Sequence, residues 1–198
     1  MARPIEFNRP ESVVAAQVLF WRQGYTATSL AQLLDAMQIG RSSFYAAFGD
    51  KRSLFIECLD LFADRTLAVF GRAWDKHHSP RAFPEFFEQT LFGVPEHRTQ
   101  RGCMLVNSVL ELADVDPEIS QLASERLARM ESRFADCLDE CRRDGILGTD
   151  NSADELAASL MIVNQGLRVA SRRGMTRKEL RLKLDATLAT LGLVHLEH

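Results

Sequence analysis

The chain has 198 residues, of which 46% are hydrophobic and 26% charged, and this ordinary globular composition argues against intrinsic disorder. No apolar run approaches the roughly 20 residues that a membrane-spanning helix needs, and the N-terminus lacks the apolar segment of a signal peptide. We therefore expect a cytosolic protein whose cysteines are free thiols.

The net charge of −3 is unevenly distributed along the chain. Residues 1–52 carry six Lys and Arg against four Asp and Glu, a net of +2, whereas the remainder carries 18 against 23, a net of −5. A basic N-terminal part on an acidic remainder is what contact with phosphates at one end of the molecule requires.

Three short helices are predicted at the N-terminus. Pro10 favours a helix start and Gly24 a stop. Thr28 or Ser29 caps a second helix, which runs to about residue 37 with apolar residues at helical spacing. A third helix is expected at about 41–48, before a break and a long fourth helix from about residue 51.

The rest of the chain is also predicted to be helical. The segment from Trp74 to Pro84 has the composition of a connection. Apolar periodicity and capping residues then indicate helices at about 84–93, 102–114, 117–143, 152–173 and 176–191.

Short helices joined by tight turns indicate helix-turn-helix geometry. In the third helix, Phe44 and Phe48 form an inner apolar face, and Tyr45 lies between the two faces with a hydroxyl able to meet a phosphate. A major groove about 12 Å wide accepts small or hydrogen-bonding side chains on the outer face. The outer residues are of this kind: Arg41, Ser42, Ser43, Ala46 and Ala47. The alternative is a structural head without a DNA role, in which Ser42 and Ser43 only cap the helix.

The segment from Gly24 to Phe55 resembles the signature of the TetR/AcrR family of repressors. It reads GYTATSLAQLLDAMQIGRSSFYAAFGDKRSLF, with an aromatic residue after the first glycine, Tyr45-x-x-Phe48 and Lys51-x-x-Leu54-Phe55. The resemblance implies an all-α bacterial protein of about nine helices and no enzymatic activity. It further implies a homodimer that binds a palindromic operator and leaves it when a small effector binds.

The resemblance also assigns residues in the N-terminal part. Thr28, Tyr45 and Lys51 match phosphate-contacting positions of the family. The positions that face bases are matched by Arg41, Ser42, Ser43 and Ala46. Arg41 is the candidate for reading guanine, the commonest specific contact. The pair Ala46-Ala47 replaces a bulkier polar pair, which favours readout of DNA shape.

We expect a helix-turn-helix domain at residues 1–52 and an effector-binding and dimerisation domain at 53–195, with 196–198 as the remnant of an affinity tag. The helices at 152–173 and 176–191 are apolar on more than one side, which predicts packing against a second subunit. A buried helical pair in a monomer is the alternative.

The ligand pocket is predicted from aromatic residues and from polar residues within apolar helices. Asn107 and Glu111 lie four residues apart on one helical face, and Asn164 interrupts another apolar helix. Such groups orient a ligand, here an apolar or aromatic effector; alternatively they join helices or lie in an exposed stripe. The candidate set is Trp74, Phe87, Met104, Asn107, Glu111, Phe134 and Asn164.

Cys103 follows Gly102 at a predicted helix start beside Arg101, an environment that lowers a thiol pKa. The pattern Arg-Gly-Cys-x-x-x-Asn resembles a subgroup of the family that includes cysteine-based sensors of electrophiles. A thiol-based repressor is therefore the alternative function, and a small buried hydrophobe the alternative role of Cys103. We find neither a catalytic motif nor a cofactor motif in the sequence. Cys137 and Cys141 are spaced so that they could bind a metal, but no nearby histidine completes the site.

Overall fold

The computed structural model describes residues 7–194, which form helices joined by turns without any strand among them, as the all-α prediction requires. The predicted tag remnant at 196–198 lies outside the described residues. The elements in chain order are α1 (Arg9–Gln23), α2 (Leu30–Met37), α3 (Arg41–Phe48), α4 (Lys51–His77), α5 (Ala82–Phe87), a π-helical turn η1 (Glu88–Phe92), α6 (Glu96–Thr99), α7 (Met104–Leu112), α8 (Pro117–Arg143), α9 (Ala153–Arg172) and α10 (Arg177–Thr190).

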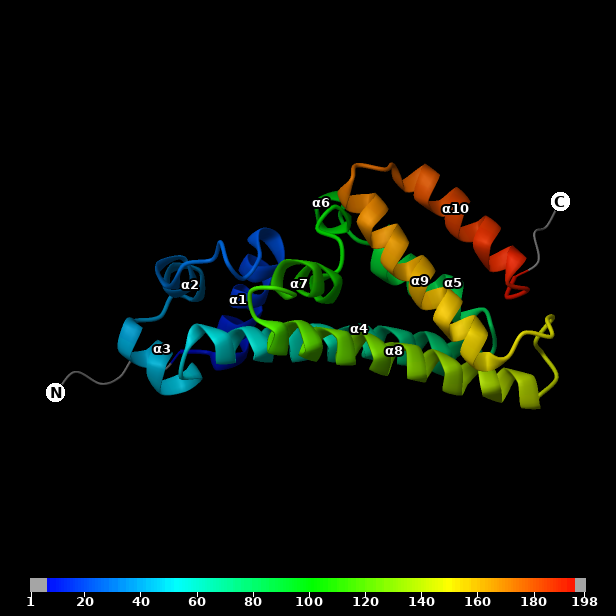
Figure 1. Ribbon diagram of the computed structural model, residues 1–198, viewed down its shortest axis with the longest axis horizontal. Coiled ribbons are helices and arrows are strands. Elements are labelled where there is room, and N and C mark those ends of the chain that lie inside the picture. The colour runs from blue at the N-terminus through cyan, green and yellow to red at the C-terminus, as the bar shows by residue number, and fades with distance from the viewer. Residues whose placement is uncertain (1–6, 195–198) are drawn as a thin grey trace.

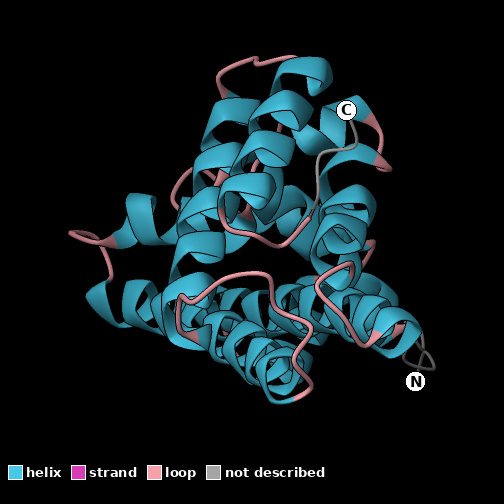
Figure 2. Ribbon diagram, turned by 90° about the vertical axis from the view of Figure 1, so that its right-hand side faces the viewer, coloured by secondary structure: helices cyan, strands magenta, loops and turns pink. Residues whose placement is uncertain are grey.

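The helices are arranged around two long ones. α4 and α8 lie side by side along the length of the molecule, and ion pairs between Arg126 and Asp60 and between Arg129 and Asp64 join them (Figure 1). We call α1–α3 the head; it lies around the beginning of α4 (Figure 1). We call α5–α10 the body. A view turned by 90° shows that loops are confined to the connections between helices (Figure 2).

Local capping sets the starts of several helices. Ser29 caps α2, Ser152 caps α9 and Thr176 caps α10. In each case the hydroxyl accepts the backbone N–H three residues later, and the Gln or Glu side chain at that later position accepts the N–H of the cap residue. These reciprocal bonds satisfy donors that a helix start leaves unpaired, which is why the sequence identifies the starts well.

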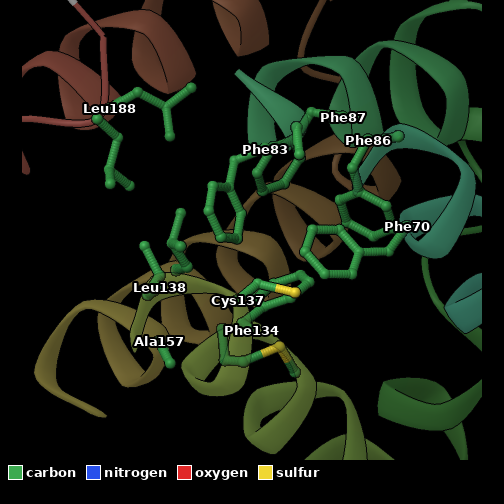
Figure 3. Packing of buried hydrophobic residues seen from close by; sticks show 14 of the residues in the cluster. Phe70, Phe83, Phe86, Phe87, Phe134, Cys137, Leu138, Ala157 and Leu188 are labelled. Carbon is green, nitrogen blue, oxygen red and sulfur yellow. The ribbon is translucent and has the colours of Figure 1, made fainter. Parts of the chain in front are cut away.

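Aromatic packing dominates the core of the body. The rings of Phe70, Phe83, Phe86 and Phe134 point toward one another, with the Phe70 and Phe134 centroids 4.6 Å apart (Figure 3). All four side chains are fully buried. Edge-to-face and tilted contacts of this kind add to the free energy gained by removing the rings from water.

A second hydrophobic cluster fills the head and continues into the body. It contains buried residues of α1–α3 together with Leu54 and Phe55 of α4 and Met104 and Leu112 of α7. Further along α4, Phe70 belongs to the cluster of the body. α4 therefore contributes to both cores, and the predicted boundary at residue 52 falls in its first turn.

The predicted connection from Trp74 to Pro84 is wrong in extent. α4 continues through Trp74 to His77, because the indole is buried in the core of the body and tertiary packing extends the helix. α5 then begins at Ala82, before Pro84. The short helix α6 was missed in the sequence, as four residues give too little periodicity to detect.

Replacing Phe134 with Ala tests the importance of the aromatic cluster. We expect Phe134→Ala to lower the free energy of unfolding by about 3–5 kcal/mol, because it removes a ring that three others contact. Urea denaturation at one fixed protein concentration measures this. Val115→Ala, at an exposed position, is the control and is expected to change stability by less than about 0.5 kcal/mol. Equal effects of the two substitutions would contradict the packing argument.

Candidate nucleic-acid interface and ligand pocket

The outer face of α3 is exposed, as predicted. Phe44 and Phe48 are buried and hold the helix against the rest of the head. On the opposite side Arg41, Ser42 and Ala46 are exposed, Ser43 is half-buried, and the Tyr45 side chain is 48% exposed. The N-cap of α3 is Gly40 and makes no side-chain cap bond, so the alternative capping role of Ser42 and Ser43 is not observed. The outer face of α3 therefore consists of exposed small or polar side chains, which is the kind of face that a DNA groove accepts.

Thr28 does not lie on this outer face. Its side chain is only 1% exposed, and its hydroxyl donates to the carbonyl oxygen of Gly24 at 2.5 Å while accepting from Gln23 at 3.1 Å. In this conformation the hydroxyl is committed to the turn between α1 and α2. The phosphate contact of Thr28 stays a prediction, and local sequence does not reveal that the turn folds back on this residue.

Lys51 begins α4 next to the Asp50 cap, with its ammonium 4.3 Å from the ring centroid of Tyr25. Partial burial lowers the pKa of Lys51, and the negative charge of Glu111 acts in the opposite direction. The adjacent Arg52 pairs with Asp116 at 2.9 Å and Glu118 at 2.6 Å at the start of α8. The first turn of α4 is thus fixed both to the head and to α8.

Glu111 of α7 joins the body to the head. Its two carboxylate oxygens accept the backbone N–H groups of Tyr25 at 3.1 Å and Thr26 at 2.7 Å. The carboxylate lies so close to Gly24, whose φ is +88°, that a Cβ added there would be 2.5 Å from Glu111 Oε2. Only glycine permits this approach and this backbone conformation. Hydrogen bonds to a charged acceptor are among the stronger ones in proteins.

A cavity of about 440 Å³ lies between the head and the body, lined by residues of α1, α4, α7 and α9. Of the predicted ligand residues, Met104, Asn107 and Glu111 line it. Asn107 donates to the carbonyl oxygen of Arg101 at 2.9 Å, so its amide also holds the segment before α7. The cavity meets the end of α1 through Phe20 and Trp21.

The other predicted ligand residues lie away from this cavity. Trp74, Phe87 and Phe134 are buried in the hydrophobic cluster of the body. Asn164 is buried too, and its Oδ1 accepts from Arg168 Nε at 3.4 Å. Aromatic content alone does not distinguish core from pocket, because both bury rings.

Trp21, Arg168 and Arg172 are among the lining residues that sequence reasoning missed. Arg168 lies four residues after Asn164 within the same apolar helix, so the principle that identified Asn164 also applies to it. Trp21 and Arg172 carry no comparable local signal, since they come together only where α1 and α9 line the same cavity.

Cys103 is the N-cap residue of α7 and is buried. Burial raises the pKa of its thiol, while the positive charge of Arg168 and the N–H groups of Val106 and Leu105 act in the opposite direction. Because the desolvation effect is the largest, the structure favours the thiol over the reactive thiolate. Burial also raises the pKa of Cys137 to about 12 and that of Cys141 to about 11.

Within residues 7–194, no three His, Cys, Asp or Glu side chains come together as metal ligands. Nor is any helix in that range long and apolar enough to cross a bilayer.

A three-helix head whose third helix exposes one face, attached to a helical body with a cavity, is the arrangement found in helix-turn-helix regulators. A family model described as bacterial regulatory proteins, tetR family, matches residues 13–58, and one described as tetracyclin repressor-like, C-terminal domain, matches 83–186. The second alone covers more than half of the chain. The chain belongs to the TetR family of DNA-binding transcriptional regulators.

Known relatives and solved structures agree with this assignment. The chain is 27% identical over 188 residues to the HTH-type transcriptional repressor ComR of Escherichia coli (strain K12), covering 94% of this chain and 90% of ComR. It is 41% identical over 135 residues to the HTH-type transcriptional repressor BdcR of the same strain, covering 68% and 67% of the two chains. A cysteine mutant of the TetR family regulator CifR, complexed with 26-bp double-strand operator DNA, superimposes with a TM-score of 0.86 at 27% identity, covering 96% of this chain and 100% of that one.

The link made by Glu111 can be tested by amide hydrogen exchange. Glu111→Gln removes the charge and leaves one oxygen for two donors, so we expect exchange at the Tyr25 and Thr26 amides to rise by roughly 10-fold or more. Asp114→Asn, at an exposed site just beyond α7, is the control and should leave both amides unchanged. Unaltered exchange in Glu111→Gln would mean that the carboxylate does not hold the head.

Proposed function

We propose that this TetR-family regulator is a repressor that binds a two-fold symmetric operator as a homodimer and leaves it when a small effector binds in the body. The observation that carries the proposal is the exposed face of α3, where Arg41, Ser42 and Ala46 face outward over a buried Phe44 and Phe48. An exposed helix of this kind fits the major groove. The operator complex of the CifR mutant, with its TM-score of 0.86, supports the same mode of binding.

Each residue of the interface has a proposed role. Arg41 donates to a guanine edge, while Ser42, Ser43 and Ala46 approach bases closely enough to sense groove shape. Tyr45 places its hydroxyl on a phosphate. Lys51, at the start of α4, neutralises a phosphate beside Tyr25. Few of these groups read bases directly, so most of the affinity is electrostatic and depends on salt.

Exposed apolar side chains on α9 and α10 support the homodimer. Ile162 is 72% exposed and Leu182 71%, and Val169 is exposed on the same side of α9, two turns after Ile162. Gly166 and Ala186 continue the two exposed faces with small residues. Large apolar side chains clustered on adjacent helices mark an interaction surface. Pairing α9 and α10 with their copies in a second subunit buries them in a four-helix contact.

Release follows from the position of the cavity. Glu111 lines the cavity and also holds the Tyr25 and Thr26 amides of the head. An effector that displaces this carboxylate changes the position of the head relative to the body. In a dimer the spacing of the two recognition helices must match the operator half-sites, so a small change at each head lowers affinity for DNA.

DNA binding is tested by mobility shift on the DNA upstream of the chain's own gene, with non-specific competitor and a salt series. Arg41→Ala is expected to cost about 1–3 kcal/mol and to relax specificity at one position in a selection from random DNA. Lys51→Ala should weaken binding to all sequences and lower the salt slope by about one. Arg72→Ala, at an exposed arginine of α4 outside the head, is the control. The absence of any specific complex on genomic DNA would refute the proposal.

The dimer interface is tested by sedimentation. Ile162→Glu together with Leu182→Glu places two carboxylates in each half of the proposed contact, and we expect the protein to become monomeric at micromolar concentration. The control is Val115→Glu, an exposed apolar residue outside α9 and α10, which should leave the dimer intact. A monomeric wild-type protein, or a double variant that stays dimeric, would contradict the assignment.

A further inference from the structure

Arginines without a carboxylate partner gather around the cavity. A second hollow of about 350 Å³ adjoins it, and both are lined by Trp21 and Arg172. Within residues 7–194, none of the arginines that line the two hollows or stack on Trp21 forms an ion pair. They are Arg22, Arg98, Arg101, Arg168, Arg172 and Arg173.

Arg168 is the most informative of these residues because it is only 9% exposed. Its guanidinium donates to the carbonyl oxygen and the hydroxyl of Thr90, each at 2.8 Å, and to Asn164 Oδ1 at 3.4 Å. All three acceptors are neutral. Burial lowers the pKa of Arg168, Cys103 acts in the opposite direction, and the nearby charge of Arg98 lowers the pKa further. Buried charges in proteins are normally paired, so a counter-charge is expected here.

The lining itself offers little negative charge. Glu111 is the only acidic residue among the lining residues of the two hollows, and both of its oxygens accept backbone N–H groups of the head. Because this carboxylate is committed to Tyr25 and Thr26, Arg168 and Arg172 of α9 have no acidic partner among the described lining residues.

A buried donor without an acceptor lies at the same place. The indole Nε1 of Trp21 is inaccessible to solvent and has no hydrogen-bond partner among the described residues. The guanidinium groups of Arg98 and Arg101 lie 5.6 and 5.7 Å from the Trp21 ring. Buried indole N–H groups are normally satisfied, and this one is an unused donor between two hollows rich in positive charge.

We infer that the two hollows form one binding site for an organic anion, with its carboxylate between Arg168 and Arg172 and its apolar part against Phe20, Phe55 and Met104. This inference rests on the proposed function, since it names the class of effector. The anion supplies the missing counter-charge, and Trp21, which lines both hollows, lies beside it. Apolar walls with a few convergent polar groups are typical of small-molecule sites.

The charge of the ligand also provides the means of release. A carboxylate bound in this cavity lies beside Glu111, and two like charges at close range in a partly buried site repel each other. Repulsion weakens the bonds from Glu111 to the Tyr25 and Thr26 amides. A neutral ligand of the same shape lacks this effect.

Matched pairs of ligands test the inference by isothermal titration calorimetry at constant ionic strength. The probes are benzoate against benzamide and butyrate against butyramide. We expect the wild type to bind at least one carboxylate about 10-fold more tightly than its amide, and Arg172→Gln and Arg168→Gln each to remove most of that preference. Arg72→Gln, at an exposed arginine of α4, should retain it. Arg172 is exposed, so its substitution reports on binding even where Arg168→Gln unfolds.

Fluorescence provides an independent readout of location. In a Trp74→Phe background Trp21 is the sole tryptophan, and its emission should change on saturation with the preferred carboxylate. Equal affinity for carboxylates and amides, no binding of either, or unchanged emission of Trp21 on binding would overturn the inference. So would a dimer that dissociates in Arg172→Gln without any loss of ligand preference, because a partner's carboxylate would then be the counter-charge.

Mobility shift on the same preparations separates the two proposals. Specific DNA binding together with a failure of every carboxylate refutes the anion site alone. Loss of DNA binding in the ligand-free wild type refutes the proposed repressor function, whatever the calorimetry shows.

Discussion

Two hydrogen bonds from the Tyr25 and Thr26 amides to Glu111 hold the head against the body. They require Gly24 at its positive φ, because any Cβ would displace the carboxylate. The same carboxylate lines the cavity and acts on the charge of Lys51 at the start of α4. One side chain thus bonds to the head, lines the cavity and influences the charge of Lys51, so we expect the position of the head to depend on what surrounds Glu111.

α4 connects the region of this local contact to the core of the body. Its first turns pack in the core of the head through Leu54 and Phe55, and its later turns pack in the aromatic cluster through Phe70 and Trp74. Arg52 adds a charged anchor to Asp116 and Glu118 at the start of α8. Packed interiors deform little, so we expect a displacement at one end of such a helix to move the attached head as a unit.

The recognition helix and the cavity place opposite demands on polar side chains. On α3, Ser42 and Ala46 are small and exposed, and in the proposed complex they let the DNA groove approach the backbone. Around the cavity, Arg168 is buried and bonded only to neutral acceptors. Exposed small groups stabilise little by themselves and are suited to a partner, whereas a buried charge without a counterion is unfavourable until a ligand neutralises it. We interpret the first feature as the proposed DNA-binding face and the second as part of the proposed anion site.

The sequence by itself determined the helices, the turn geometry of the head and the family, because caps and apolar spacing act over a few residues: Ser29, Ser152 and Thr176 are examples. It also placed Arg41 and Tyr45 on an exposed face. It did not determine that α4 runs through Trp74, that the Thr28 hydroxyl turns inward, or that Phe87 and Phe134 belong to the core. Only the tertiary structure decided where the cavity lies. It alone also decided that Glu111 accepts hydrogen bonds from Tyr25 and Thr26, which precede it in the sequence by 86 and 85 positions. Such contacts depend on the packing of whole helices, which no local pattern encodes.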